Sequence, residues 1–408
     1  MHKENKKASI PLGPIHPALK EPVQVEVSLS GEKVTDVKIT LGHVHRGIEW
    51  IGMRRNPIQT LYIAERICGI CNICHPLAFC IAIEEAANMA VPERAEYLRT
   101  IYAELERIHS HLLFLGVAAH EIGFDSILHY TWLAREKVLD IIEMLTGNRI
   151  TKGVLMIGGV RRDITDHHIK KIKKMLEYYE KVYNKMFKLF VDDKTIKMRT
   201  CNIGFLSKKD ALKLCAVGPT ARASGVKKDT RQDFPYAAYS DLDIEALTPD
   251  HVLGYINGDV YDRLVLRLVE IKQSIGIIRS AIRSIPSGSI VAEPNIQKLL
   301  FNLKQVSGEG VSLVEAPRGE LIHYIRMEKK DAPTAWKIRA PTYSNLHVLP
   351  TLLADCELAD VPIIVASIDP CMSCTNRAVI TDKNTILYKE KLHELSVEKT
   401  RKLRGVLK

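Results

Sequence analysis

The sequence predicts a mainly α fold, a bundle of long helices with small β-hairpin subdomains near both ends. Apolar residues recur at helical spacing through most of the chain, whereas short segments near each end alternate between apolar and polar residues. The chain has 408 residues, of which 46% are hydrophobic and 26% charged, a composition typical of a globular protein with a large core. No repeat or low-complexity linker interrupts it, so we expect one compact unit.

Two hairpins account for the expected β structure. Apolar and polar residues alternate over residues 23–29, Gly31 allows a turn, and the alternation resumes over residues 34–39. Apolar positions between residues 308 and 327 predict the second hairpin.

Helical spacing predicts the other elements. The first helix begins near His75 and ends before Pro92, because proline cannot continue a helix. Further helices are expected over residues 94–122, 126–146, 164–190, 259–284 and 340–359.

These elements divide the chain into three parts. We expect an N-terminal β-hairpin region over residues 1–60, a helical core that includes the second hairpin over residues 61–377, and a C-terminal tail over residues 378–408.

The net charge of +10 includes lysine-rich segments at residues 170–174 and 399–408. A basic surface can attract nucleic acid or an anionic membrane. No nucleic-acid-binding motif accompanies it and only 6% of residues are aromatic, so we expect no nucleic-acid partner. We find no run of about 18 apolar residues that would predict a membrane-spanning helix. The charged residues 1–7 precede no apolar secretion signal, so we expect reduced thiols.

Two cysteine pairs carry the strongest chemical signal. Cys68 and Cys71 lie near the start of the chain, whereas Cys371 and Cys374 lie near its end. Each C-x-x-C pair can place two thiolates on one metal ion, so two pairs supply a complete four-sulfur site. Because most of the chain separates the pairs, the metal would join its two ends. From the residues alone, a catalytic centre and a structural zinc site both stay open.

The segments around these pairs, residues 66–75 and 369–377, resemble the two signatures of the large subunit of NiFe hydrogenases. The resemblance implies a NiFe centre with carbon monoxide and cyanide bound to the iron. Its thiolates would be terminal on nickel at Cys68 and Cys371, and would bridge nickel to iron at Cys71 and Cys374. A bridging thiolate of this kind, at Cys374, would also take up a proton.

Other residues match the family around this centre. Glu21, in residues 13–22, resembles the gate glutamate that relays protons to and from a nickel-bound cysteine. Arg318 resembles the arginine beside the carbon monoxide and cyanide ligands of the iron. Asp369 resembles the acidic residue that lies beside the same ligands. Arg66 and His75 of the first signature would lie against the cofactor, with His75 hydrogen-bonded to a bridging sulfur. Taken singly, each charged residue is more typical of an ion pair.

Two residues differ from the usual family pattern and indicate which subfamily the chain resembles. Glu49 resembles the family's carboxylate ligand of a magnesium or iron ion, but Arg377 replaces the histidine that usually completes that site, and a guanidinium does not coordinate a cation. Ser110 stands where uptake enzymes usually carry aspartate. With residues 45–49 and 218–226, the chain resembles the membrane-associated, energy-converting hydrogenases of methanogens and formate-hydrogenlyase-like complexes. These are similar to the quinone-site subunit of respiratory complex I.

The resemblance implies a reversible reaction in which two protons and two electrons give H2. No Fe–S ligand set remains once the four cysteines are used, so electrons would enter through a small subunit with a 4Fe–4S cluster, fed by ferredoxin-like subunits. Integral-membrane subunits would couple the reaction to ion translocation, and nickel-insertion and maturation proteins would assemble the centre. The chain would be cytoplasmic, peripheral on the inner face of the cell membrane.

Two other functions and the fate of the tail stay open. A non-catalytic, complex I-like coupling subunit would share the fold, although such relatives lose the cysteine pairs. A zinc-stabilised structural subunit would hold a single zinc ion. A protease would cut the tail between Arg377 and Ala378 after nickel insertion, as in many relatives, or the tail would be retained, as in some energy-converting members.

Overall fold

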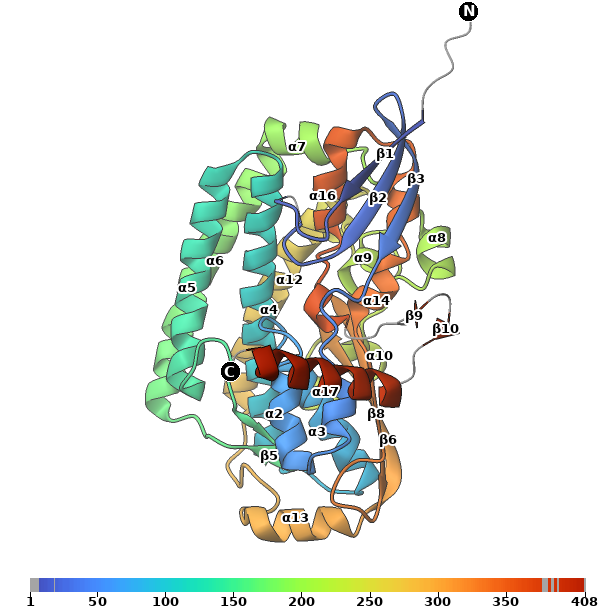
Figure 1. Ribbon diagram of the computed structural model, residues 1–408. Helices are drawn as coiled ribbons and strands as arrows, with labels where there is room; N and C mark the ends of the chain where they lie inside the picture. Colours follow the sequence, from blue (N-terminus) through green and yellow to red (C-terminus); the bar gives the residue numbers. More distant parts are fainter. Residues whose placement is uncertain (1–6, 18, 376–380, 383–384, 387–388, 407–408) are drawn as a thin grey trace, which may run out of the picture.

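The computed structural model describes residues 7–17, 19–375, 381–382, 385–386 and 389–406. Four long helices form one side of it, with α5 and α6 at its edge (Figure 1): α4 (Glu93–Glu121), α5 (Asp125–Thr146), α6 (Asp166–Asp192) and α12 (Val260–Ser284). Both α4 and α6 pack against α5 and α12, so the four helices form a bundle. Helices α4 and α12 are buried along most of their length. The sequence predicted all four helices, with ends within two residues of those observed.

Two three-stranded antiparallel sheets flank the bundle, each containing one of the predicted hairpins. The N-terminal sheet consists of β1 (Lys7–Leu12), β2 (Gln24–Ser30) and β3 (Lys33–Thr40). The second sheet consists of β6 (Ser307–Ala316), β7 (Gly319–Glu328) and β8 (Ala335–Arg339). The outer strands β1 and β8 were not predicted. Two-stranded ladders join β4 (Leu155–Met156) to β5 (Gly159–Val160), and β9 (Thr381–Asp382) to β10 (Thr385–Ile386).

The predicted helix over residues 340–359 is wrong. The chain there forms α14 (Pro341–Leu346), α15 (Leu349–Leu353), a 3-10 turn (Leu358–Asp360) and α16 (Val361–Ser367). Pro350 and Pro362 each lie in the first turn of a new helix, where no backbone N–H is needed. Asp355 between them has a left-handed φ of 59°, which ends the helical path.

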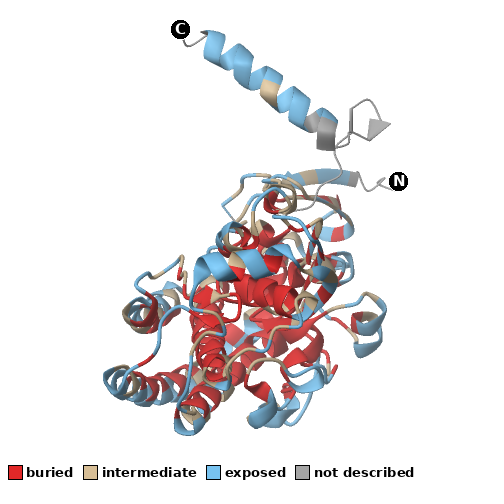
Figure 2. Cartoon of the chain, turned by 90° about the horizontal axis from the view of Figure 1, so that it is seen from below, coloured by how far each residue is buried: buried red, intermediate tan, exposed pale blue. Residues whose placement is uncertain are grey.

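Shorter helices connect these elements. They are α1 (Ile48–Gly52), α2 (Pro57–Glu65), α3 (Cys74–Ala86), α7 (Lys194–Thr200), α8 (Lys208–Lys213), α9 (Gly218–Arg222), α10 (Thr230–Asp233), α11 (Asp250–Leu253) and α13 (Ile296–Lys304). The last helix, α17 (Lys389–Val406), extends from the body of the molecule and is largely exposed (Figure 2). Within the described ranges, no helix has both the length and the apolar character needed to cross a membrane.

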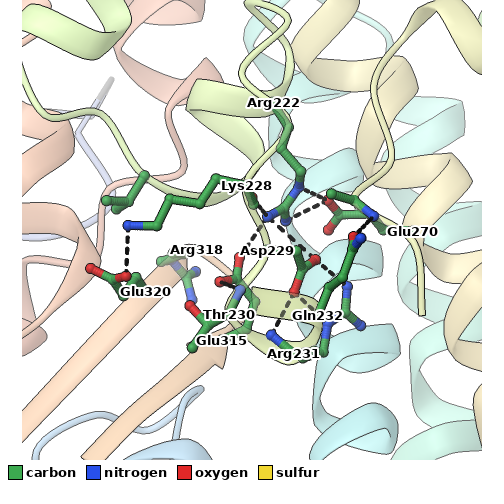
Figure 3. Close-up of polar contacts among 12 residues, drawn as sticks. Arg222, Lys228, Asp229, Thr230, Arg231, Gln232, Glu270, Glu315, Arg318 and Glu320 are labelled. Atoms are coloured by element: carbon green, nitrogen blue, oxygen red, sulfur yellow. Dashed lines mark hydrogen bonds and ion pairs between the residues drawn. The ribbon is translucent and has the colours of Figure 1, made fainter. Parts of the chain in front are cut away.

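A network of buried ion pairs joins α9, α10 and β6 to α12 (Figure 3). Arg222 contacts Glu270 and Glu315, each at 2.8 Å. Arg231 contacts Asp229 at 2.7 Å. All five side chains are almost completely buried, so each charge depends on its partners rather than on water.

Glu104 of α4 belongs to the same network. It contacts Arg107 at 3.2 Å and Arg231 at 3.1 Å, and it accepts hydrogen bonds from Tyr239 and Ser274, each at 2.6 Å. Burial alone would raise the pKa of Glu104, but the two guanidiniums lower it to about 2. Because this pKa lies below the ordinary 4.5, the resulting stability is present at neutral pH. It is lost as the pH falls from about 4.5 to about 2.

Replacing this carboxylate should therefore destabilise the fold. We expect Glu104→Gln to lower the free energy of unfolding by about 3–5 kcal/mol at pH 7, because the buried Arg107 loses its counter-ion and Arg231 loses one of its two. Urea unfolding measures the change. Glu180→Gln removes an exposed ion pair with Arg279 and should cost about 0–1 kcal/mol. Equal losses in the two variants would contradict a structural role for the buried network.

Candidate metal centre

The two cysteine pairs meet in the core of the molecule. Cys68 and Cys71 lie in the loop between α2 and α3, whereas Cys371 precedes and Cys374 ends a 3-10 turn (Met372–Cys374) after α16. The sulfur of Cys371 lies 3.3 Å from that of Cys68 and 3.2 Å from that of Cys374. The sulfurs of Cys68, Cys71 and Cys374 lie within 4.8 Å of one another. All four thiols are buried, so the structure brings together the predicted ligands from both ends of the chain.

Cys68 is the thiol that ionises most readily. Hydrogen bonds from Cys371, Cys374 and Cys71 lower the pKa of Cys68 well below its ordinary value. The backbone N–H groups of Ile70 and Cys71 also donate to its sulfur, each at 3.2 Å. Conversely, the neighbouring thiols and burial raise the pKa of Cys374. Since metal ions bind thiolates and displace their protons, this soft donor set fits nickel and low-spin iron, and also zinc.

Arg318, at the turn between β6 and β7, faces the thiols. Its Nη1 donates to Cys71 Sγ at 3.2 Å and to Ser110 Oγ at 3.4 Å. Its Nε and Nη2 donate to the carbonyl and the carboxylate of Asp369, each at 2.8 Å. Burial would lower the pKa of Arg318, but Asp369 and the nearby sulfurs raise it well above its ordinary value. The guanidinium therefore stays charged beside the cluster.

His75, in the first turn of α3, faces another of the thiols. Its Nε2 lies 3.4 Å from Cys374 Sγ. Burial lowers the pKa of His75 to about 4, so the imidazole is neutral at pH 7. A neutral imidazole donates a hydrogen bond from only one ring nitrogen. In His75, Nε2 is the nitrogen that faces the sulfur of Cys374.

Arg46 joins the backbones of the two cysteine loops, a role that the sequence analysis missed. Its Nη1 donates to the carbonyl of Arg66 at 2.8 Å, and its Nη2 donates to the carbonyls of Ile67 at 2.6 Å and Ser373 at 2.9 Å. A planar guanidinium can reach several carbonyls at fixed angles. One side chain therefore holds segments from both ends of the chain. The only signal in the sequence was its place in residues 45–49.

Glu21 contacts the second cysteine loop. Its carboxylate accepts hydrogen bonds from the backbone N–H of Met372, from that of Ser373 at 3.3 Å, and from the Ser373 hydroxyl. Both N–H groups lie between Cys371 and Cys374 in the chain. The carboxylate therefore lies against the turn that carries these two thiols.

The side chain of Arg66 does not join the cluster. It is exposed and donates to the carbonyl of Tyr62 at 2.8 Å, one turn back in α2. Only its backbone carbonyl takes part, through Arg46. Because Arg66 ends α2, its side chain follows the outer surface of that helix rather than the loop.

Glu49 also has other partners. Its carboxylate accepts a hydrogen bond from the backbone N–H of Ile338 at 2.9 Å and pairs with Lys337 at 3.4 Å. In the part of the chain that the structure describes, no group of three or more metal-binding side chains forms around it. An ion beside Glu49 therefore stays a prediction. Arg377, at the position that usually completes such a site, lies outside the described residues.

An apolar pocket of about 300 Å³ adjoins the cluster. Its charged lining residues are Glu21, Arg318 and Asp369, together with the ion pair of Lys20 and Glu121. Apolar side chains from the first cysteine loop, α4, α16 and the second cysteine loop form much of the rest: Ile70, Leu113, Phe114, Val117, Val365 and Met372. Such walls suit a small apolar molecule.

Known proteins resemble this chain along most of its length. A family model described as the 49 kDa subunit of the respiratory-chain NADH dehydrogenase matches residues 121–377, and one described as nickel-dependent hydrogenase matches residues 46–118. The alpha subunit of the membrane-bound hydrogenase of Pyrococcus furiosus is 46% identical, over 97% of this chain and 93% of its own length. The carbon monoxide-induced hydrogenase of Rhodospirillum rubrum is 39% identical, over 90% and 99% respectively.

Two further relatives carry other names. One subunit of the F420H2 dehydrogenase of Methanosarcina mazei is 35% identical, over 92% of this chain and 99% of its own length. A solved chain of the membrane-bound sulfane sulfur reductase, an archaeal respiratory membrane complex, superposes with a TM-score of 0.85 at 28% identity, covering 92% of this chain and 100% of that one. The chain therefore belongs to the family that comprises the complex I 49 kDa subunit and the NiFe hydrogenase large subunit.

Proposed function

We propose that this chain is the catalytic subunit of an energy-converting NiFe hydrogenase, which interconverts H2 with two protons and two electrons. The observation that carries the proposal is the convergence of four buried thiols from both ends of the chain, with Arg318 and His75 directed at two of the sulfurs. A complex I-like coupling subunit without a metal would not need this cluster. A structural zinc site would not need the charged pair of Arg318 and Asp369 beside it.

In this proposal, Cys68 and Cys371 would hold nickel, and Cys71 and Cys374 would be ligands of both nickel and an iron that carries carbon monoxide and cyanide. When bound, the NiFe group supplies the cleavage of H2 into a hydride and a proton. Arg318 offers donors and a fixed positive charge to ligands on the iron, and Asp369 holds the guanidinium in place by two hydrogen bonds.

Proton transfer is assigned to Glu21 and Cys374. The Glu21 carboxylate lies against the turn that carries Cys374 and also lines the apolar pocket. A carboxylate can accept a proton from a thiol and release it outward. The apolar walls of the pocket would admit H2, which has no polar groups, while excluding water from the thiols.

Electrons would arrive through other subunits. The cluster that contains Cys68, Cys71 and Cys374 is the only group of three or more metal-binding side chains within the described ranges. We therefore assign electron transfer to a small subunit with a 4Fe–4S cluster and to ferredoxin-like subunits. By analogy with the membrane-bound relatives, integral-membrane subunits would translocate ions and hold this chain on the cytoplasmic face.

We assign the metal ligands to the helical core over residues 61–377, and the N-terminal region over residues 1–60 contributes Glu21. The proposed cleavage after Arg377 falls outside the described residues, and α17 would be part of the released tail.

The proposal predicts a defined metal content. The natively purified complex should contain nickel in near-equimolar amount to this chain, beside the iron of its Fe–S clusters, and show sharp infrared bands of iron-bound carbon monoxide and cyanide. Cys374→Ser should lose the nickel and these bands, because a hydroxyl is a poor ligand for soft metals. Cys215→Ser, an exposed cysteine outside the cluster, should keep both. Zinc in place of nickel, without such bands in complex made with its maturation proteins, would contradict the proposal.

Glu21→Gln tests the proton route. Glutamine keeps the shape of the side chain but cannot carry protons, so H2 turnover should fall by about 100-fold or more while nickel content stays unchanged. Turnover is measured by H2 evolution from a chemical reductant. Glu32→Gln, an exposed carboxylate in the β2–β3 turn, is the control. Near wild-type turnover in Glu21→Gln would place the proton route elsewhere.

Arg46→Met tests the contact between the two loops. Loss of three hydrogen bonds to backbone carbonyls should lower the affinity for nickel by about 10–100-fold. Arg46→Lys should not restore it, since a single ammonium cannot span all three carbonyls. Nickel content after dialysis against a chelator measures the effect, with the exposed Arg55→Met as control. Full retention of nickel in Arg46→Met would show that the loops close without this contact.

A further inference from the structure

A row of hydrogen bonds leads from the thiol cluster into the second sheet. Beyond the contact of His75 Nε2 with Cys374 Sγ, His75 Nδ1 lies 3.2 Å from His323 Nε2. His323 Nδ1 in turn lies 3.3 Å from Nε1 of Trp336. His323 of β7 and Trp336 of β8 have no exposed surface, and His75 has 1%. Buried side chains therefore connect Cys374 to β8.

The chemistry of the indole fixes the direction of every proton in this row. Trp336 Nε1–H can only donate, so Nδ1 of His323 must accept and carries no proton. In the neutral ring the proton then lies on Nε2 of His323, which donates to His75 Nδ1. His75 consequently carries its own proton on Nε2 and donates it to the sulfur of Cys374. We assign these protons from the network, since each position follows from the one before.

Packing holds the indole at the start of the row. The ring of Phe79 meets Trp336 edge to face, with centroids 5.4 Å apart. Gly52 at the end of α1 leaves the room that the indole occupies, because a Cβ there would lie 2.3 Å from two ring carbons. The position of Trp336 is therefore set by α1 and α3 as well as by its own strand.

We propose that His323 and Trp336 are positioning residues that hold the Nε2–H of His75 on Cys374 Sγ and so set the electron density at that thiolate. The inference rests on the proposed function, in which Cys374 bridges the two metals. A hydrogen bond withdraws electron density from a thiolate and raises the reduction potential of the metals it binds. Without His323 and Trp336, His75 could place its proton on Nδ1 and turn a lone pair toward the sulfur.

A purely structural role of His323 and Trp336 would not require this arrangement of hydrogen bonds. Apolar side chains of similar size could fill the space between α3 and the sheet, without three polar rings that each need a partner. The row satisfies all of its buried nitrogens only with the protons directed toward Cys374.

Infrared spectra of the holoenzyme test the inference, with a redox titration of the nickel signal as a second readout. Trp336→Phe keeps an aromatic ring but removes the N–H that fixes the tautomer of His323. His323 and His75 can then each adopt two tautomers, so the carbon monoxide and cyanide bands should split into two populations, one shifted to lower wavenumber. His323→Phe removes the donor to His75 and should shift the bands the same way and lower the midpoint potential. Nickel content should remain at the wild-type level in both variants.

His323→Gln provides the rescue. Its amide offers both an acceptor for the indole and a donor for His75, so the bands should return to the wild-type positions. Trp50→Phe, at a half-buried tryptophan that packs against Arg54 and His393, is the matched control and should change nothing.

The outcomes separate the two proposals. Wild-type enzyme without nickel and without the infrared bands would overturn the proposed function itself. Bands present in the wild type and unchanged in Trp336→Phe and His323→Phe would overturn only the positioning role. If His323→Phe does not assemble, Trp336→Phe decides alone, because it keeps an apolar ring in the same space. A shift of equal size in Trp50→Phe would also count against the inference.

Discussion

The core of this protein depends on closing two distant segments of the chain around four thiols. Bringing such segments together costs chain entropy, so the junction needs strong local contacts. Arg46 and Glu21 supply them in complementary ways, because the cation binds carbonyls of both loops and the anion binds N–H groups of the second loop. The N-terminal sheet is itself fixed to the far end of the chain, since Val34 N–H donates to the carbonyl of Cys356 at 2.9 Å.

Buried charged residues also fix the end of the first cysteine loop. The N–H groups of Ile73 and Cys74, at the start of α3, donate to the carboxylate of Glu106 at 2.6 and 2.9 Å. A carboxylate at this position satisfies donors that the helix cannot, and it complements the helix dipole. Lys152, 2.9 Å away, balances its charge. Because α3 also packs on β6 and β7, the helix that orients His75 supports the hairpin that carries Arg318.

The sequence allowed prediction of features that local patterns encode. Helical spacing revealed α4, α5, α6 and α12 because each buries one or more faces over many turns, and C-x-x-C spacing revealed the thiols. The helix over residues 340–359 was wrong because helical spacing does not show where Pro350 begins a new helix and Asp355 ends it. Arg46 and His323 escaped notice because their partners are remote in the chain, and for Arg46 they are backbone carbonyls, which carry no side-chain signature. Arg66 shows the converse, since a place beside Cys68 in sequence does not decide where a side chain points.

The charge balance beside the thiols depends on the residue at position 110. In the resemblance drawn from sequence, uptake hydrogenases carry aspartate where this chain has Ser110, and the Ser110 hydroxyl is a neutral partner of Arg318 at 3.4 Å. Asp369 is then the one carboxylate that contacts this guanidinium among the described residues. A second carboxylate would compete for the same N–H groups and offset more of the positive charge. With serine in its place, Arg318 directs Nη1 to the sulfur of Cys71 at 3.2 Å, where a positive charge favours the thiolate that a metal requires.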